Sequence, residues 1–250
     1  MNELSLFTGA GGGVLGTHLL GWTPIGYVEW DDYCQRVIAA RVRDGLLPAA
    51  PIFGDVREFA QSGAADEYRG FADVVSAGFP CQPFSVAGKQ RAADDERNMW
   101  PATAEVIRRV QPKSVLLENV PGLISCGYLG TVIGDLAALG YVGRWGVLGA
   151  CDAGAPHRRN RLWIVAHAYR DGFQERVHER RSSAAQNGSE HERSAFDGVP
   201  ASQVRRAWHL ASEPILGRGT DGVAHRVDRL RALGNGQVSS VVQRAWEALA

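Results

Sequence analysis

Apolar and polar residues alternate along the chain with two distinct periods. Short apolar runs bounded by turn residues predict strands, whereas apolar residues spaced three or four positions apart predict amphipathic helices. The predicted strands are residues 3–7, 25–29, 73–77, 114–118, 141–148 and 161–166. The predicted helices are residues 14–21, 31–42, 100–111 and 238–249. This alternation of strands and helices predicts an α/β fold with a mostly parallel sheet.

One edge of this sheet is expected to carry the ligand sites, because open α/β sheets bind ligands at the carboxyl ends of their strands. The residues at the carboxyl ends of the predicted strands there are 8–13, Glu29, 77–81 and Glu118. A glycine-rich turn, two acids and a cysteine are therefore the first candidates for a functional site.

The composition changes after residue 166. Residues 168–215 are rich in Arg, His, Ser, Gln, Asn and Glu and show no lasting apolar period, which predicts either a small irregular module or a partly disordered insertion. In the helix predicted at 238–249, the apolar residues fall on one face. We expect this helix to pack back on the main domain.

The chain has 250 residues, of which 45% are hydrophobic and 22% charged, as is ordinary for one globular catalytic domain with a small appendage. No apolar run approaches the roughly 20 residues that a membrane helix needs. No basic stretch precedes the first apolar residues, so no secretory signal is visible and we expect a cytoplasmic protein.

The net charge of zero hides an uneven distribution. Residues 1–150 carry 12 Lys and Arg against 16 Asp and Glu, whereas residues 151–250 carry 15 against 11. All 15 of those cations are Arg, a side chain suited to forked contacts with phosphates and guanine edges. The C-terminal part is therefore either a surface for a polyanion or a solvated face.

The four cysteines are Cys34, Cys81, Cys126 and Cys151. None forms a CxxC pair, which disfavours a zinc site, and the absence of a visible secretory signal disfavours disulfides. The cysteines are thus isolated thiols, each of which is either a small buried hydrophobe or a candidate nucleophile.

The glycine turn after the first strand contains Gly11, Gly13 and Gly16 in a G-x-G-x-x-G pattern, and Glu29 ends the next strand. Glycines allow close approach of the backbone to a nucleotide, and such an acid binds ribose hydroxyls. The pattern fits a dinucleotide oxidoreductase, an S-adenosylmethionine enzyme or a purely structural turn.

Cys81 lies between two prolines in GFPCQPFSVAGKQ (78–90), directly after a predicted strand. Prolines restrict the local backbone and hold the thiol in one direction. The segment ENV (118–120) brings Glu118 to the same sheet edge. A cysteine paired with an acid beside a nucleoside site indicates covalent attack on an electrophilic ring that the acid polarises.

In this order, FTGAGGG (7–13), GFPCQPFS (78–85) and ENV resemble the signature motifs of the DNA (cytosine-5)-methyltransferases. Further segments that resemble motifs of this family are VEWDD (28–32), GDV (54–56), RNMW (97–100), DAGAPHRRNR (152–161) and LGNG (233–236). The sequence departs from the family pattern at His157, where the family has Gln, and after GNG, where it usually has a Pro.

The resemblance implies an α/β, Rossmann-like, S-adenosylmethionine-dependent methyltransferase with a small, irregular target-recognition domain. It divides the chain into a catalytic domain (1–167), a target-recognition segment (168–215) and a C-terminal segment (216–250) that returns to the catalytic domain. It also implies a bacterial or phage-type protein whose partner is double-stranded DNA, which acts as a monomer on DNA and needs no metal.

The resemblance also maps functional residues onto this chain. The implied catalytic residues are Cys81, Glu118, Arg159 and Arg161. The implied cofactor-binding residues are Phe7, Gly9, Ala10, Gly11, Gly12, Glu29, Trp30, Asp55, Val56, Pro80, Met99, Asn235 and Val238. The implied DNA-binding residues are Gln82, Ser85, Lys89 and Gln90, together with Arg159 and Arg161.

The implied reaction begins when the target cytosine leaves the duplex. Cys81 then adds to ring carbon 6, Glu118 protonates ring nitrogen 3, and ring carbon 5 takes the methyl group. Two alternatives stay open. A transfer-RNA cytosine methyltransferase uses the same chemistry, although it typically has a different sequence where this chain has Pro83-Phe84-Ser85. The second alternative, a nicotinamide-dependent oxidoreductase, is supported by the glycine turn alone.

Overall fold

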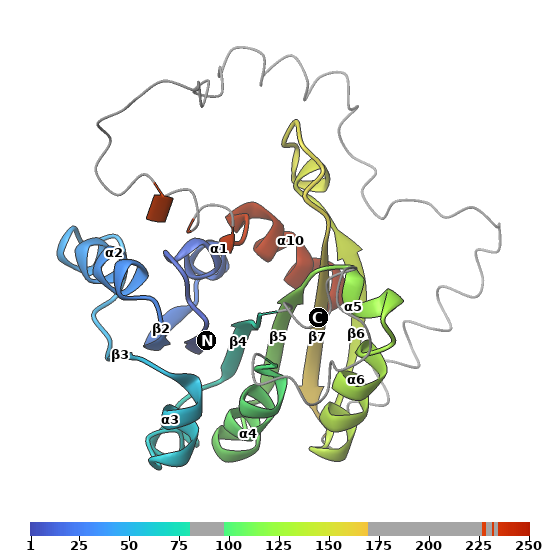
Figure 1. Cartoon of the computed structure of the whole chain (residues 1–250), viewed down its shortest axis with the longest axis horizontal. Helices are drawn as coiled ribbons and strands as arrows, with labels where there is room; N and C mark the ends of the chain where they lie inside the picture. Colours follow the sequence, from blue (N-terminus) through green and yellow to red (C-terminus); the bar gives the residue numbers. More distant parts are fainter. Residues whose placement is uncertain (81–97, 170–226, 229–231, 233–234) are drawn as a thin grey trace.

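The structure, a computed structural model, describes residues 1–80, 98–169, 227–228, 232 and 235–250. Within these residues a seven-stranded sheet has the order β3-β2-β1-β4-β5-β7-β6 (Figure 1). Its strands are β1 (Asn2–Leu6), β2 (Thr23–Val28), β3 (Ile52–Phe53), β4 (Val74–Gly78), β5 (Ser114–Asn119), β6 (Tyr141–Leu148) and β7 (Arg161–Ala168). Strands β1 to β5 pair in parallel, and β7 is antiparallel to both β5 and β6.

Helices cover both faces of the sheet. They are α1 (Gly12–Leu19), α2 (Asp32–Arg43), α3 (Val56–Gln61), α4 (Trp100–Val110), α5 (Gly122–Ser125), α6 (Leu129–Ala138) and α10 (Ser239–Leu249), with short 3-10 helices at Asp66–Tyr68 and Ala150–Ala153. Helices α1, α2 and α10 lie on one face, and α3, α4 and α6 lie on the other (Figure 1). Within the described ranges, no helix has the length and apolar character needed to cross a bilayer.

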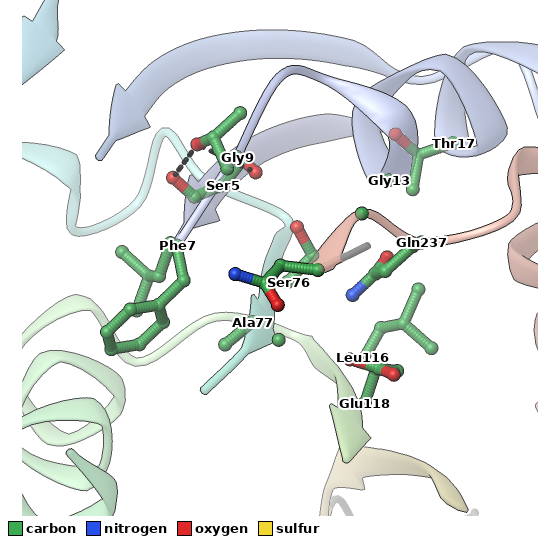
Figure 2. Close-up of a pocket in the computed structure, with 15 residues that line it drawn as sticks. Ser5, Phe7, Gly9, Gly13, Thr17, Ser76, Ala77, Leu116, Glu118 and Gln237 are labelled. Carbon is green, nitrogen blue, oxygen red and sulfur yellow. Dashed lines mark hydrogen bonds between the residues drawn. The ribbon is translucent and has the colours of Figure 1, made fainter. Parts of the chain in front are cut away.

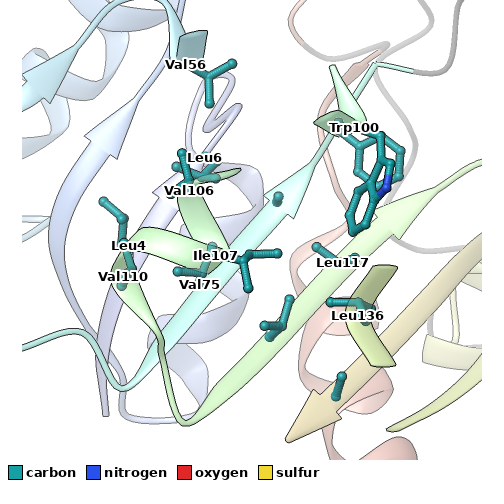
Figure 3. Close-up of a cluster of buried hydrophobic side chains, with 14 of the residues drawn as sticks. Leu4, Leu6, Val56, Val75, Trp100, Val106, Ile107, Val110, Leu117 and Leu136 are labelled. Atoms are coloured by element: carbon teal, nitrogen blue, oxygen red, sulfur yellow. The ribbon is translucent and has the colours of Figure 1, made fainter. Parts of the chain in front are cut away.

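The central strands contribute side chains to both layers of the core, because successive side chains of a strand point to opposite faces. On β5, Val115 and Leu117 join the core cluster with α3, α4 and α6, whereas Leu116 joins the cluster with α10. Figure 3 shows the first cluster, in which Ile107 of α4 lies close to Val75 of β4. Burial on both faces explains why these strands read as nearly continuous apolar runs.

The predicted α/β fold is confirmed. Every predicted strand and helix is present, with ends that differ by two residues or fewer. The sequence analysis missed β3, α3, α5 and α6. Strand β3 has only two residues, which pair with Tyr27 and Val28, and so short a segment has no measurable period. The short helices α3 and α5 are equally hard to detect, and α6 mixes glycine with apolar residues.

Glycine allows α1 and α10 to pack closely. A methyl group added at Gly16 would lie 2.5 Å from the Ser239 carbonyl oxygen and 2.6 Å from Cβ of Val242. A methyl group added at Gly12 would lie 2.6 Å from the Gln237 carbonyl oxygen. The Ser239 hydroxyl also donates a hydrogen bond to the Gly12 carbonyl over 2.7 Å. The C-terminal segment therefore lies directly against the N-terminal glycine turn, as its apolar face predicted.

Replacing Gly16 with alanine tests this contact. We expect Gly16→Ala to lower the free energy of unfolding by about 1–3 kcal/mol, because overpacking forces backbone or side-chain shifts. The matched control is Gly134→Ala, since Gly134 is also helical but has open space around it. That control should raise stability by up to about 1 kcal/mol. Urea unfolding of both variants measures the difference, and equal stabilisation by the two alanines would contradict close packing at Gly16.

A buried acid lies between helix α1 and strand β4. Glu3 of β1 is fully buried, and its carboxyl group accepts hydrogen bonds of 2.5 Å from both Thr17 and Ser76 hydroxyls. Burial raises the pKa of Glu3 from 4.5 to about 7, although the two hydroxyl hydrogen bonds oppose the change. The folded protein therefore holds a proton here that the unfolded chain releases at lower pH.

This proton makes stability depend on pH. Because the folded pKa is raised, the stabilisation is complete below about pH 4.5 and is lost as pH rises through about 7. The loss should approach about 3 kcal/mol, at 1.36 kcal/mol for each tenfold change in proton affinity. Glu3→Gln should abolish this part of the pH dependence in denaturant unfolding between about pH 5 and 8. The control Glu58→Gln, at an exposed position, should keep the wild-type slope, and a wild-type slope in Glu3→Gln would refute the raised pKa.

Candidate active site

The carboxylate of Glu29 lies between the glycine turn and helix α2. Its Oε2 accepts a 2.6 Å hydrogen bond from the Gly9 N–H, and its Oε1 accepts one of 2.8 Å from the Asp31 N–H. Gln35 donates from its side chain to the Glu29 carbonyl over 2.6 Å. Glu29 is only 9% exposed, so these bonds hold a nearly buried carboxylate in one orientation.

The turn between β1 and α1 contains several residues with left-handed backbone conformations. Phe7 has φ 52°, Gly9 has φ 57° and Gly11 has φ 90°. The Thr8 N–H donates to the Val28 carbonyl over 3.2 Å, which ties the turn to the end of β2. The positive φ values at Gly9 and Gly11 explain the need for glycine, since side chains strain this conformation.

A cavity of about 430 Å³, here called the main cavity, lies at the carboxyl edge of the sheet. Its volume lies within the range of small-molecule sites in proteins. Of the predicted site residues, those that line it are Phe7, Gly9, Glu29, Trp30, Asp55, Val56, Pro80, Met99, Glu118, Arg161 and Asn235. Ala10, Gly11, Gly12 and Val238 do not line it, and their contact with a cofactor stays a prediction.

A smaller pocket of about 40 Å³ lies beneath the glycine turn and shares Phe7, Gly9 and Glu118 with the main cavity (Figure 2). It extends to Gln237 of the C-terminal segment. The glycine turn, the end of β5 and the C-terminal segment therefore meet at one place.

The wall of the main cavity offers both an apolar ring and a charged pair. Trp30 is 71% exposed, so the face of its indole ring is available to a planar ligand. The carboxylate of Asp55 is bound by the Arg57 guanidinium through three contacts of 2.6–3.1 Å. Hydrogen bonds from Arg57 lower the pKa of Asp55, so this carboxylate is ionised and fixed. Arg57 lines the cavity but was not predicted from the sequence.

Glu118 lies near the end of β5, next to Arg161 at the start of antiparallel β7. Arg161 Nε lies 2.9 Å from Glu118 Oε1. Burial raises the pKa of Glu118 above its ordinary value, although the charges of Arg161 and Arg159 and a hydrogen bond from Gln237 act in the opposite direction. A carboxyl group with a raised pKa is suited to carry and donate a proton.

Arg159 connects this carboxyl group to the C-terminal segment. Its Nη2 donates a 2.7 Å hydrogen bond to the Gly236 carbonyl. Its φ of 36° is left-handed, a conformation that is strained for a residue with a side chain and is found most often at functional sites. Arg159 and Arg161 both lie around Glu118, but only Arg161 lines the main cavity, and the catalytic roles of both stay predictions.

Asn119, the residue after Glu118, holds the segment that leads to Cys81. Its side-chain amide donates a 3.1 Å hydrogen bond to the Phe79 carbonyl, and its side-chain oxygen accepts one of 2.8 Å from the Val120 N–H. Asn119 is 3% exposed, so both bonds are shielded from water. It fixes the backbone just before Pro80, which lines the main cavity.

Several predicted residues lie outside the described residues: Cys81, Gln82, Ser85, Lys89, Gln90 and nearly all of the segment 168–215. Their roles stay predictions. Sequence reasoning missed Arg57, Asn119 and Gln237. Asn119 belongs to the ENV motif and Arg57 lies two residues after Asp55, so both could have been found from the sequence, whereas the contact of Gln237 depends on folding and leaves no local pattern.

Comparison with known proteins adds evidence on the family. The family model for the C-5 cytosine-specific DNA methylase matches residues 1–215. The chain is 35% identical over 167 residues to the type II methyltransferase M.NgoMIV of Neisseria gonorrhoeae, a match covering 66% of this chain and 51% of the relative. It is 37% identical over 179 residues to M.HaeII of Haemophilus aegyptius, covering 70% and 51%. The chain thus spans about half the length of these curated relatives.

Solved structures share the fold. A mutant DNMT2 from Spodoptera frugiperda superposes with a TM-score of 0.61 at 14% identity, covering 98% of both chains. A DNA modification methyltransferase encoded in a prophage of E. coli superposes with a TM-score of 0.54 at 23% identity, covering 67% of this chain and 47% of that one. The family match over most of the chain, with this fold and these site residues, shows that the protein belongs to the C-5 cytosine-specific DNA methylase family.

Proposed function

We propose that this protein transfers a methyl group from S-adenosylmethionine to carbon 5 of cytosine at a specific sequence in double-stranded DNA. The observation that carries the proposal is that Glu29, Pro80 and Glu118 line one cavity. The same space therefore contains an acid placed to bind a nucleoside (Glu29), the residue before the candidate nucleophile (Pro80) and a carboxyl group whose pKa is raised (Glu118). The cytosine C-5 family model supports this reaction, and the type II methyltransferases that resemble the chain support methyl transfer.

The residues of the main cavity fit S-adenosylmethionine. Glu29 presents a fixed carboxylate to two ribose hydroxyls, since each of its oxygens keeps a lone pair beyond the backbone hydrogen bonds. The exposed ring of Trp30 and the apolar side chains of Val56 and Met99 suit the adenine. When bound, the cofactor supplies an electrophilic methyl group on a sulfonium.

The residues of the chain divide the chemistry between them. The Cys81 thiolate adds to carbon 6 of the extruded cytosine, and Glu118 gives its proton to ring nitrogen 3, so that no negative charge builds up on the ring. Carbon 5 then accepts the methyl group. A base takes the proton from carbon 5, which expels the Cys81 thiolate and restores the double bond between carbons 5 and 6, while nitrogen 3 returns its proton to Glu118. Arg161 holds Glu118 in place throughout.

DNA recognition is assigned to the arginine-rich region that follows β7. The segment 168–215 lies between the two parts of the catalytic framework and carries Arg, Gln and Asn, the side chains that read base edges in the major groove. Gln82, Ser85, Lys89 and Gln90 follow the candidate nucleophile and are proposed to contact the DNA around the extruded base.

The alternative functions lose support. The oxidoreductase hypothesis depended on the glycine turn, yet two glycines of that pattern, Gly13 and Gly16, are needed for contact with the C-terminal segment, and the family match leaves the hypothesis without a basis. Methylation of transfer RNA uses the same residues, so the substrate itself decides between the two. Incorporation of labelled methyl groups into DNA but not into transfer RNA is the expected result.

Covalent trapping tests the nucleophile. Duplex DNA that contains 5-fluorocytosine should form a stable adduct with the wild type in the presence of S-adenosylmethionine, because fluorine cannot leave carbon 5 as a proton does. Cys81→Ala should neither methylate DNA nor form the adduct on a denaturing gel. The exposed cysteines provide controls, and Cys126→Ala and Cys151→Ala should trap normally. An adduct in Cys81→Ala would show that another thiol is the nucleophile.

Calorimetry tests the role of Glu29. Hydrogen bonds to a charged group contribute roughly 1.5–3 kcal/mol. Glu29→Ala should therefore weaken S-adenosylmethionine binding roughly ten- to a hundredfold. The control Glu58→Ala removes an exposed carboxylate outside the main cavity and should bind normally. Because Glu29 also accepts two backbone hydrogen bonds, the unfolding curve is recorded in parallel. Unchanged affinity in a folded Glu29→Ala protein would place the ribose contact elsewhere.

A further inference from the structure

We infer that Gln237 is a positioning residue that holds the carboxyl group of Glu118 in the orientation needed for proton transfer to the base. This inference rests on the proposed function. It concerns a residue of the C-terminal segment, far from Glu118 in the sequence, that enters the site only through folding.

The side chain of Gln237 passes between two glycines. A methyl group added at Gly13 of α1 would lie 2.5 Å from Gln237 Oε1. A methyl group added at Gly78, at the end of β4, would lie 2.7 Å from Gln237 Nε2. Figure 2 shows Gln237 between Gly13 and Glu118. The two glycines thus provide a passage from the C-terminal segment to the catalytic carboxyl group.

The amide of Gln237 lies beside the Glu118 side chain: both residues line the smaller pocket, and a contribution from the Gln237 amide lowers the pKa of Glu118. It reaches this side chain from the Gly78 side, where Glu118 Oε2 lies 3.0 Å from the same added methyl position. Arg161 holds the other oxygen, Oε1, over 2.9 Å. Two donors from two different segments therefore restrict rotation of one carboxyl group.

The side chain of Gln237 is uncharged, and this suits a position beside a carboxyl group that must keep its proton. The charges of Arg161 and Arg159 already favour the ionised form of Glu118, and burial opposes them. A further cation at position 237 would favour the carboxylate more strongly and deprive the base of its proton donor. An uncharged donor fixes the geometry with a smaller effect on proton affinity.

The same short segment also borders the other parts of the site. Asn235 lines the main cavity, and the Gly236 carbonyl accepts the hydrogen bond from Arg159. Gln237 then reaches Glu118. Residues 235–237 therefore border the main cavity, Arg159 and Glu118 in succession.

Substitution of Gln237 with methionine tests the inference, because methionine keeps the length of the side chain but cannot donate a hydrogen bond. We expect the single-turnover rate of methyl transfer to fall at least about tenfold, as misplacement of a reacting group commonly causes. We also expect the high-pH limb of the rate profile, where Glu118 loses its proton, to move to higher pH, since the lost donor had favoured the ionised form. Gln237→Glu should move this limb further, because two carboxyl groups would share the site.

The matched control is Gln243→Met. Gln243 donates a 2.9 Å hydrogen bond to Glu247 on the exposed face of α10, so its loss should change neither rate nor pH profile. A purely structural role for Gln237 would lower stability without moving the limb. A wild-type rate and an unmoved limb in Gln237→Met would overturn the inference.

A second readout needs neither substrate nor turnover. The raised pKa of Glu118 means that stability falls as pH rises through it, and loss of the Gln237 donor should extend this fall to higher pH. In a Glu118→Gln background the substitution should have no pH-dependent effect. If the wild type fails to methylate DNA, the proposed function is wrong, whereas an unchanged pH dependence of unfolding in Gln237→Met would refute the contact with Glu118 itself.

Discussion

The close packing of the C-terminal segment against the N-terminal glycine turn is the contact on which the site depends. Because Gly16 has no side chain, Ser239 and Val242 can lie against it, and the backbone of Gln237 lies against Gly12 for the same reason. No side chain larger than hydrogen fits at these positions without a shift of backbone atoms. The first and last described segments of the chain therefore meet at the sheet edge, where residues 235–237 complete a cavity begun by β1, β2 and β5.

The second constraint is electrostatic. Glu118 is removed from water by the sheet around it, which favours its protonated form, while two arginines favour its ionised form. A catalytic acid needs this balance, because a fully stabilised carboxylate has no proton to give and an isolated buried acid cannot release one. The antiparallel strand β7 makes the balance possible, since it runs opposite to β5 and starts with Arg161 beside Glu118.

Glu3 and Glu118 show that burial alone does not make an acid catalytic. Both carboxyl groups have raised pKa values because of desolvation. Glu3 is enclosed by the hydroxyls of Thr17 and Ser76 and lies at 0% exposure, so it has no access to a ligand. Glu118 lines the main cavity. Access to the cavity, rather than the pKa, separates the structural acid Glu3 from the candidate catalytic acid Glu118.

The sequence by itself determined the order of strands and helices, the mostly parallel sheet and the edge at which the site lies, because apolar period and strand direction are local properties. It also determined the approach of Glu29 and Glu118, since both follow parallel strands that end at one edge. It could not detect β3, whose two residues have no period of their own and are held by pairing with β2.

Only the tertiary structure decided which donors surround each acid. The Gly9 N–H donates to Glu29, Asn119 holds the backbone at Phe79, and Gln237 crosses between Gly13 and Gly78 to Glu118. The glycines had a local interpretation as a nucleotide turn, but three of them, Gly12, Gly13 and Gly16, also make room for a segment more than two hundred residues away in the chain. Such a fit depends on the shapes of two distant surfaces, and no pattern within either segment encodes it.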